Sequence, residues 1–291
     1  MLVEIFCEID DFCKFFEKEA NIKLLGSQAN VGRKPGLSVS EIITISIHYH
    51  TSRMTSFKDY YNTMVRGFLR SAFTNPVSYN RFIELRQQVM IPLLLFVKTR
   101  ALGDCDGISI IDSTTLELCH VLRASSHKLF KGIAQKGKTS TGWFYGFKLH
   151  LIINSQGEII SFYITPGNVS DNNPEVLDAM TDDIFGKMIA DRGYIGRFKQ
   201  MYEKGITLVH GIRKNMKNNL MDVFDKWLLT KRGIIETVFG ILKEWLALES
   251  SKNRNQIAYF VQIISALAAY HFKAEKPCIF PNSSIAKLCV S

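Results

Sequence analysis

Two aspartates follow short apolar segments, a setting in which a carboxylate could take part in chemistry at the edge of a sheet. Asp112 comes directly after the isoleucine-rich segment 108–111, and Asp191 directly after the segment 187–190. Both segments are typical of buried strands, and the end of such a strand is where a sheet usually presents its active groups. The simpler interpretation is that Asp112 only caps the turn that follows it.

A third acid, Glu236, lies in a helix that we expect over residues 228–248. Arg232 precedes it by four positions and Lys243 follows it by seven, so the three side chains cluster along one side of that helix. Basic groups beside an acid in this way can hold a phosphate chain and stabilise the charge that develops at phosphorus.

Three carboxylates brought to one point repel one another unless cations neutralise them. Carboxylate oxygens suit Mg²⁺ or Mn²⁺, and two such ions about 4 Å apart hold the attacking and leaving oxygens of an in-line phosphoryl displacement. Asp112, Asp191 and Glu236 therefore predict a two-metal site that hydrolyses a phosphodiester or joins one to a 3′-hydroxyl. With 27 acidic residues in the chain, this prediction rests on the context of the three acids rather than on their type.

Basic residues dominate the segment that follows Asp112. Between residues 121 and 148 there are six lysines and arginines and no acid. We expect the part 136–142 to be a flexible loop that holds a phosphate backbone near Asp112, although a solvated loop is the simpler alternative. Besides Arg232 and Lys243, the residues expected to contact DNA are Lys136, Lys138, Lys148, Arg192, Arg213 and Lys214.

Length and composition bound the kind of protein. The chain has 291 residues, 46% of them hydrophobic, which is enough for one large domain or two smaller ones. A net charge of +9 favours a polyanionic partner such as nucleic acid, but a basic protein without one has the same composition. The six cysteines form no C-x-x-C pair, which argues against a zinc site and for reduced thiols in the cytosol. The acidic N-terminus and the short apolar runs predict neither a signal peptide nor a membrane span.

The first hundred residues read as helices. Apolar residues at helical spacing predict helices over 1–24, 38–51, 56–67 and from Ser78 to about Leu93, with a glycine-rich loop over 26–37. Ser38 and Glu41 match a capping box at the start of the second helix. These helices could be a helix-turn-helix DNA reader or a plain bundle. Their best candidates for phosphate contacts are Arg53, Lys58, Arg66 and Arg70.

The rest of the chain alternates strands and helices. Residues 143–153 and 159–164 predict a β-hairpin in which Lys148 and His150 occupy an open face. A helix begins near Asp171, strands follow at 187–190 and 206–212, and a last apolar helix covers 256–273. We expect His127 and His210 to be ordinary hydrogen-bonded histidines, the aromatic run 143–145 to pack in or at the edge of the sheet, and Trp245 to lie in the core.

Five segments of the chain resemble the DDE transposases of bacterial insertion sequences, and most closely the insertion-sequence 982 family. They are IIDSTTL (110–116), GWFYGFKLHLIIN (142–154), TPGNVSDN (165–172), IADRGY (189–194) and RGIIETVFGILK (232–243). The last matches the Arg-x3-Glu-x6-Lys part of a family signature that often begins with Tyr, where this chain has Leu229.

This resemblance implies an α/β fold with an RNase H-like (retroviral-integrase-like) catalytic core, preceded by an all-α N-terminal region. The domains would be residues 1–100, a helical region that could contain a helix-turn-helix; residues 101–275, the catalytic domain; and residues 276–291, a C-terminal tail. Only 45 positions separate Asp191 from Glu236, which leaves no room for a large inserted β domain.

The resemblance also implies a function. Asp112, Asp191 and Glu236 would bind two Mg²⁺ or Mn²⁺ ions, and Arg232 and Lys243 would contact the transposon end. The enzyme would cut at terminal inverted repeats and join the 3′-hydroxyl ends to target DNA. It would act as a homodimer or higher oligomer, on the nucleoid in the bacterial cytoplasm, and would have no membrane partner. Two alternatives stay open: a nuclease with the same core that does not join strands, and a catalytically silent DNA-binding derivative.

Overall fold

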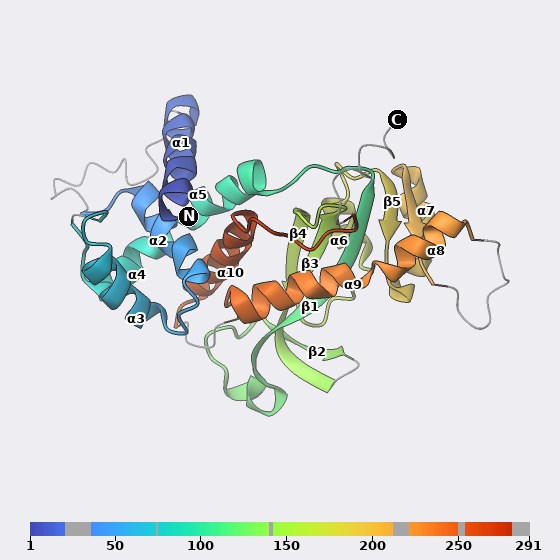
Figure 1. The fold of residues 1–291 in the computed structure, drawn as a ribbon. Helices are drawn as coiled ribbons and strands as arrows, with labels where there is room; N and C mark the ends of the chain where they lie inside the picture. Colours follow the sequence, from blue (N-terminus) through green and yellow to red (C-terminus); the bar gives the residue numbers. More distant parts are fainter. Residues whose placement is uncertain (21–35, 74, 140–141, 212–220, 250–253, 281–291) are drawn as a thin grey trace. The chain divides into compact units, whose positions relative to one another are not determined.

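The computed structural model describes residues 1–20, 36–73, 75–139, 142–211, 221–249 and 254–280. The chain divides into two compact units (Figure 1). One contains residues 1–101 and 241–273, and the other contains residues 102–240 and the described residues 274–280, each without the segments that the structure does not describe. The expected boundary at residue 275 therefore differs from the observed division, because the segment 241–273 packs with the N-terminal helices.

The first unit is helical. Its elements are α1 (Leu2–Ala20), α2 (Val39–Thr51), α3 (Phe57–Tyr60), the π-helix η1 (Tyr61–Phe68), α4 (Tyr79–Gln88), α5 (Met90–Phe96), the π-helix η2 (Val97–Ala101), the π-helix η5 (Ile241–Trp245) and α10 (Gln256–His271). Ser38 caps α2 by accepting a hydrogen bond from the Glu41 amide, and the Glu41 carboxylate accepts one from the Ser38 amide, which confirms the capping box. The expected loop 26–37 lies largely outside the described residues.

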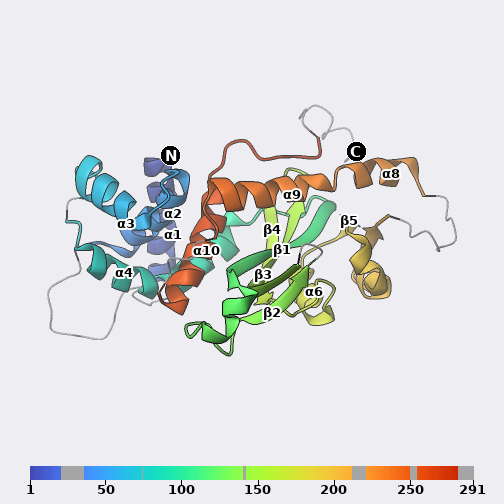
Figure 2. The same ribbon diagram turned by 90° about the horizontal axis from the view of Figure 1, so that it is seen from below.

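The last helix of the first unit explains why residues 241–273 belong there. α10 packs against α2, α4 and α5 (Figure 2), and its residues from Ala258 to Tyr270 are buried except Phe260. A helix that is apolar on nearly every face must be surrounded by other elements, and the N-terminal helices supply them.

Trp245, which we expected in the core, has 51% of its surface exposed, so that expectation is wrong.

Among the described residues, the second unit contains a six-stranded mixed sheet. Its strands are β1 (Ile108–His120), β2 (Gln135–Thr139), β3 (Gly142–Asn154), β4 (Ile159–Pro166), β5 (Gly186–Ile189) and β6 (Ile206–Val209). The order is β2-β3-β1-β5-β6, and β4 also pairs with β3. β3 is antiparallel to β1, β2 and β4, whereas β1, β5 and β6 are parallel. The predicted hairpin of β3 and β4 is confirmed.

The strand that carries Asp112 is longer than expected. β1 continues beyond Asp112 to His120, because β3 pairs with it from Ser109 onward along its whole length. The parallel partner β5 stops earlier, and its last pair with β1 is Ile110 with Ile189. The prediction that Asp112 closes its strand is therefore wrong, but Asp112 does lie where β1 loses its neighbour on one side.

Two further expectations about the sheet are wrong. The segment 136–142 is not a loop over its described part, because residues from Gln135 to Thr139 form β2 at the edge of the sheet. The face of β3 that carries Lys148 and His150 is not open, since both side chains are buried. His150 hydrogen-bonds Thr165 on β4 across a distance of 2.9 Å.

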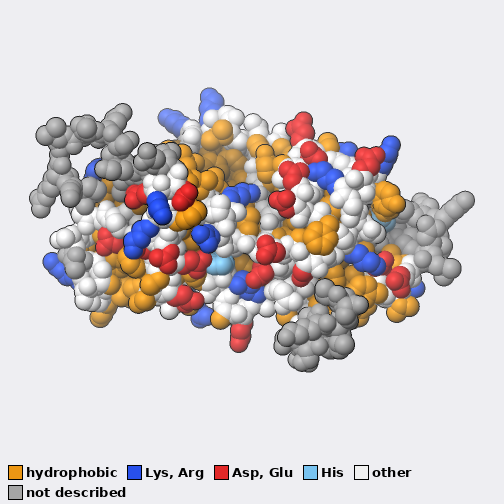
Figure 3. Space-filling view, turned by 90° about the horizontal axis from the view of Figure 1, so that it is seen from above, with side chains coloured by type: hydrophobic (Ala, Val, Ile, Leu, Met, Phe, Trp, Pro, Cys, Tyr) orange, Lys and Arg blue, Asp and Glu red, His pale blue; other side chains and the backbone are white. Residues whose placement is uncertain are grey.

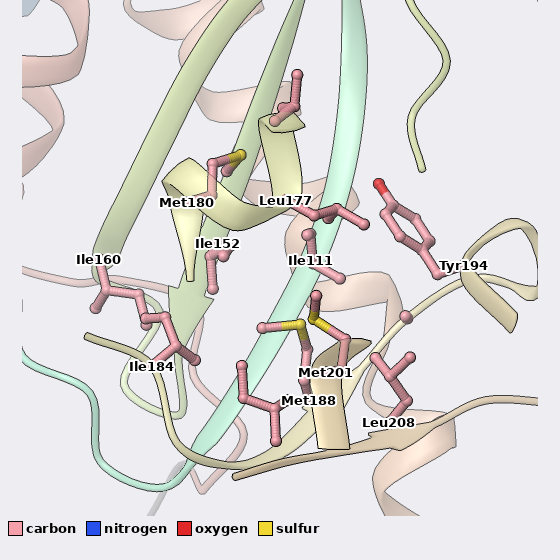
Figure 4. Packing of buried hydrophobic residues seen from close by; sticks show 13 residues of the cluster. Ile111, Ile152, Ile160, Leu177, Met180, Ile184, Met188, Tyr194, Met201 and Leu208 are labelled. Atoms are coloured by element: carbon pink, nitrogen blue, oxygen red, sulfur yellow. The ribbon is translucent and has the colours of Figure 1, made fainter. Parts of the chain in front are cut away.

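One face of the sheet is covered by short helices. Ile111 and Ile152 pack beneath Leu177 and Met180 of α6 (Pro174–Met180), as Figure 4 shows. The same buried cluster includes residues from the 3₁₀-helix η4 (Arg192–Arg197) and from α7 (Phe198–Glu203). This packing holds the segment after Asp191 against the sheet.

The other face of the sheet receives the helix that carries Glu236. The expected helix 228–248 is interrupted, with α8 (Val223–Thr230) separated by a turn from α9 (Gly233–Gly240), which packs on β1 (Figure 2). The apolar side of α9 is buried and consists of Ile235, Val238 and Phe239. Among the described helices, none combines the length and apolar character needed to cross a membrane.

Candidate functional site

Asp112 and Glu236 are joined through an arginine. Side chains alternate along β1, so Asp112 lies on the face of the sheet opposite to Ile111, which is the face that α9 covers. Arg232, in the turn before α9, places Nη1 3.6 Å from Asp112 Oδ2 and Nη2 3.1 Å from Glu236 Oε1. One guanidinium therefore neutralises part of the charge of both acids.

Asp191 lies near the same point, just after β5. The backbone carbonyl of Asp191 accepts a hydrogen bond from the amide of Tyr194, and this bond closes the first turn of η4. Burial is the main cause that raises the pKa of Asp112, to about 6, and the negative charges of Asp171 and Asp191 act in the same direction. The Ser113 amide and Arg232 oppose this shift only in part.

A fourth acid, Asp171, belongs to this neighbourhood although it was not singled out from the sequence. Its Oδ1 accepts hydrogen bonds from Ser113 Oγ at 2.6 Å and from Lys148 Nζ at 2.9 Å. The Lys148 side chain is only 10% exposed, so the structure places this lysine inside the unit and paired, not on its surface. The signal for Asp171 was its place in the segment TPGNVSDN, which also supplies Asn172, bonded to the Gly193 carbonyl.

Tyr194 is a second residue that sequence reasoning missed. Its hydroxyl is buried and has no hydrogen-bond partner among the described residues. Burial raises the pKa of Tyr194 well above its usual value, and the charges of Asp171, Asp112 and Asp191 add to that shift. The segment IADRGY contains this tyrosine, three positions after Asp191, but spacing alone gave no reason to select it.

The acids suit a divalent cation by chemistry but do not form a finished metal site. No group of three or more His, Cys, Asp or Glu side chains within the described part of the chain lies close enough together to hold a metal ion. Arg232 supplies positive charge between Asp112 and Glu236 instead. The carboxylate oxygens of these acids are the kind of donor that Mg²⁺ or Mn²⁺ prefers.

The other basic residues expected to contact DNA fall in different settings. Lys136 and Lys138 are exposed on the edge strand β2, and Arg192 is exposed directly after Asp191. Lys243, in η5, pairs with Glu249 at 2.8 Å. Arg213 and Lys214 lie outside the described residues. On the face shown in Figure 3, basic and acidic side chains are interspersed.

Comparison with known proteins gives one family match. Residues 102–256, more than half of the chain, match a family model described as "Transposase DDE domain". No curated protein matches the chain. Among solved structures, the chain is similar at a TM-score of 0.21 and 10% identity to one described as "Crystal structure of a pre-cleavage Mos1 transpososome", with 90% of this chain and 86% of that chain covered.

Proposed function

Because the chain belongs to the transposase DDE domain family, we propose that it cuts DNA at the terminal inverted repeats of an insertion sequence and joins the freed 3′-hydroxyl ends to target DNA. The observation that carries this proposal is the pairing of Arg232 with both Asp112 and Glu236, together with Asp191, which lies close enough for its charge to act on Asp112. We further propose that the insertion sequence is of the 982 family, on the strength of the five sequence segments given above.

The proposed fold of the catalytic unit is an RNase H-like core. Its support is the mixed sheet, in which β4, β3 and β1 form an antiparallel meander and β5 and β6 continue it in parallel with β1. Asp112 on the central strand, Asp191 after the neighbouring strand and Glu236 on a covering helix are the positions that such a core would use.

We propose that Asp112, Asp191 and Glu236 are the ligands of the catalytic Mg²⁺ or Mn²⁺. Two such ions would supply Lewis-acid stabilisation and an activated oxygen nucleophile for phosphoryl transfer. Within the protein, Arg232 holds Asp112 and Glu236 and offsets their charge until the site is loaded. Asp171, fixed by Lys148 and Ser113, keeps the segment after β4 against β1 beside Asp112.

The proposed partner is DNA. Lys136, Lys138 and Arg192 are exposed and basic, and we propose that they contact phosphates together with Arg232. Lys243 remains a proposed contact to the transposon end, and Arg213 and Lys214 remain proposed contacts to DNA. Two ends must be held together for joining, so a homodimer or higher oligomer acting on the nucleoid of a bacterium is part of the proposal.

A cleavage and joining assay tests the proposal. Purified full-length protein is mixed with a target plasmid and DNA that carries the inverted repeats flanking the coding sequence, with Mg²⁺ or with chelator. We expect nicked ends and joined products only with Mg²⁺, and a loss of at least about 100-fold in rate for Glu236→Gln, since a ligand carboxylate is removed. The matched control is Glu203→Gln, which removes another exposed helical glutamate that pairs with a base four positions before it.

The products separate the alternatives. Cleaved ends without joined products would favour a nuclease that does not transfer strands. DNA binding without cleavage under any metal would favour a silent DNA-binding derivative. Cleavage that survives Glu236→Gln would mean that the acidic residues are wrongly assigned.

A further inference from the structure

The helical unit contains a cavity of about 270 Å³ that the proposed catalysis does not use. It is lined by the end of α2 and the residues after it, between 49 and 55, and by residues between 244 and 247. The volume is just below the usual range of small-molecule sites. It suits a single ring system and is far too small for a duplex.

Trp245 gives the cavity an exposed aromatic wall with positive charge on it. The Trp245 side chain is half exposed. The guanidinium carbon of Arg53 lies 4.9 Å from its ring centroid, and Lys273 Nζ lies 5.5 Å from it. An aromatic ring beside basic groups is the arrangement with which proteins bind unpaired nucleotides, since the ring stacks on a base while the cations attract the phosphates.

His50 gives the cavity a buried acceptor that lacks a donor. Its Nδ1 lies 2.5 Å from the backbone carbonyl oxygen of Leu246, and because a carbonyl can only accept, Nδ1 carries the proton. Burial is the first cause that lowers the pKa of His50, to about 3, so the ring is neutral and Nε2 keeps a free lone pair. Nε2 is buried without a hydrogen-bond partner among the described residues. A ligand that brings an N–H group would remove the cost of that orphaned acceptor.

The backbone at the cavity is held in a rare conformation on both of its sides. Arg53 has φ 58° and Ala247 has φ 45°, and neither is glycine. Left-handed conformations of such residues cost free energy and occur preferentially where a site fixes its side chains for binding. In this conformation Arg53 lies over the Trp245 ring, and Ala247 follows the end of η5 by two positions.

We propose that this cavity binds one unpaired nucleobase of DNA, stacked at Trp245 and donating an N–H group to His50. The adjoining phosphate would contact Arg53 and Lys273. Glu244, which also lines the cavity, offers a second acceptor to the same edge of the base. The inference rests on the proposed function in that DNA is the partner, and it adds that the helical unit distinguishes an extrahelical base from a paired one.

A binding assay without metal tests this inference. Full-length protein is titrated into three fluorescent DNAs: a perfect duplex, the same duplex with one bulged adenine, and the same duplex with an abasic residue in the bulge. Adenine carries an amino donor and a stacking surface that the abasic residue lacks. We expect the adenine bulge to bind about tenfold more tightly than the abasic bulge.

Variants assign that preference to the cavity. Trp245→Ala should abolish it without weakening binding to the perfect duplex, and Trp245→Phe should keep most of it. The matched control is Trp143→Ala, which removes a tryptophan that is 58% exposed and has Lys138 Nζ 5.7 Å from its ring, in the other unit. His50→Phe should also reduce the preference, and thermal unfolding shows whether each variant folds.

Each outcome decides between the two proposals. Equal binding of the adenine and abasic bulges, or a preference that survives Trp245→Ala, would overturn the cavity proposal while leaving the transposase proposal intact. A preference lost equally in Trp143→Ala would also overturn it. No binding to any of the three DNAs would overturn both.

Discussion

Asp112 is the residue at which the electrostatics of the candidate site converge. It is partly buried, receives one guanidinium contact and lies near two further carboxylates. Its pKa of about 6 lies above the ordinary 3.8, so the folded protein favours the protonated acid. Above pH 6 the ionised form opposes folding, and below about pH 4 this cost is absent.

Replacing Asp112 by asparagine should therefore stabilise the protein in a pH-dependent way. In chelator, we expect Asp112→Asn to raise the free energy of unfolding by roughly 1–3 kcal/mol at pH 8 and by almost nothing at pH 4. Denaturant unfolding at the two pH values measures this. A gain of the same size at both pH values would contradict the assignment of the shift to Asp112.

Lys148 and Asp171 should behave as an energetically coupled pair. Among the described residues, Lys148→Met leaves Asp171 hydrogen-bonded to Ser113 alone. Because Asp171 is half exposed, we expect a loss of roughly 1–3 kcal/mol in the free energy of unfolding, below the larger cost of a fully buried pair. Adding Asp171→Asn to that variant should cost little more. A double-mutant cycle by urea unfolding measures the coupling, and strictly additive losses would show that the two residues act independently.

At the scale of elements, local signals predicted most of the helices and strands. The capping box at Ser38 and the alternation in β3 are properties of neighbouring residues, so the sequence contains them. The extent of β1 beyond Asp112 depends on pairing with β3, more than twenty positions away in the chain, and no local pattern shows where such pairing ends. The strand β2 likewise depends on pairing with β3, because its polar sequence is typical of a loop and forms a strand only at the edge of the sheet.

The close approach of β1 and β3 gives a prediction at this scale. A Cβ on Gly146 would lie 2.1 Å from the Leu116 carbonyl oxygen, so Gly146→Ala must displace backbone and should cost roughly 2–4 kcal/mol of stability. Gly240→Ala is the control, because a Cβ there meets nothing within 4 Å and alanine favours the helix by about 0.5–1 kcal/mol. Thermal unfolding of both variants checks the contrast, and equal stability of the two would contradict the register of β1 and β3.

At the scale of the whole molecule, the sequence predicted the class of each unit but not which segments compose it. The apolar pattern of α10 indicates a buried helix, yet nothing in that pattern says which helices surround it. The acids of the candidate site could be named because each has a recognisable local setting. Three features depend on tertiary packing and could not be predicted. They are the position of Arg232 between Asp112 and Glu236, the pairing of the buried Lys148 with Asp171, and the Tyr194 hydroxyl, which has no partner among the described residues.

Mn²⁺ binding followed by electron paramagnetic resonance measures whether Asp112, Asp191 and Glu236 together bind a divalent cation. We expect the full-length protein to bind Mn²⁺, with an affinity at least about tenfold lower in Asp112→Asn, Asp191→Asn and Glu236→Gln and unchanged in Glu203→Gln. Identical binding curves for all of these proteins, or no bound Mn²⁺ in the unmutated chain, would contradict joint binding by these three acids.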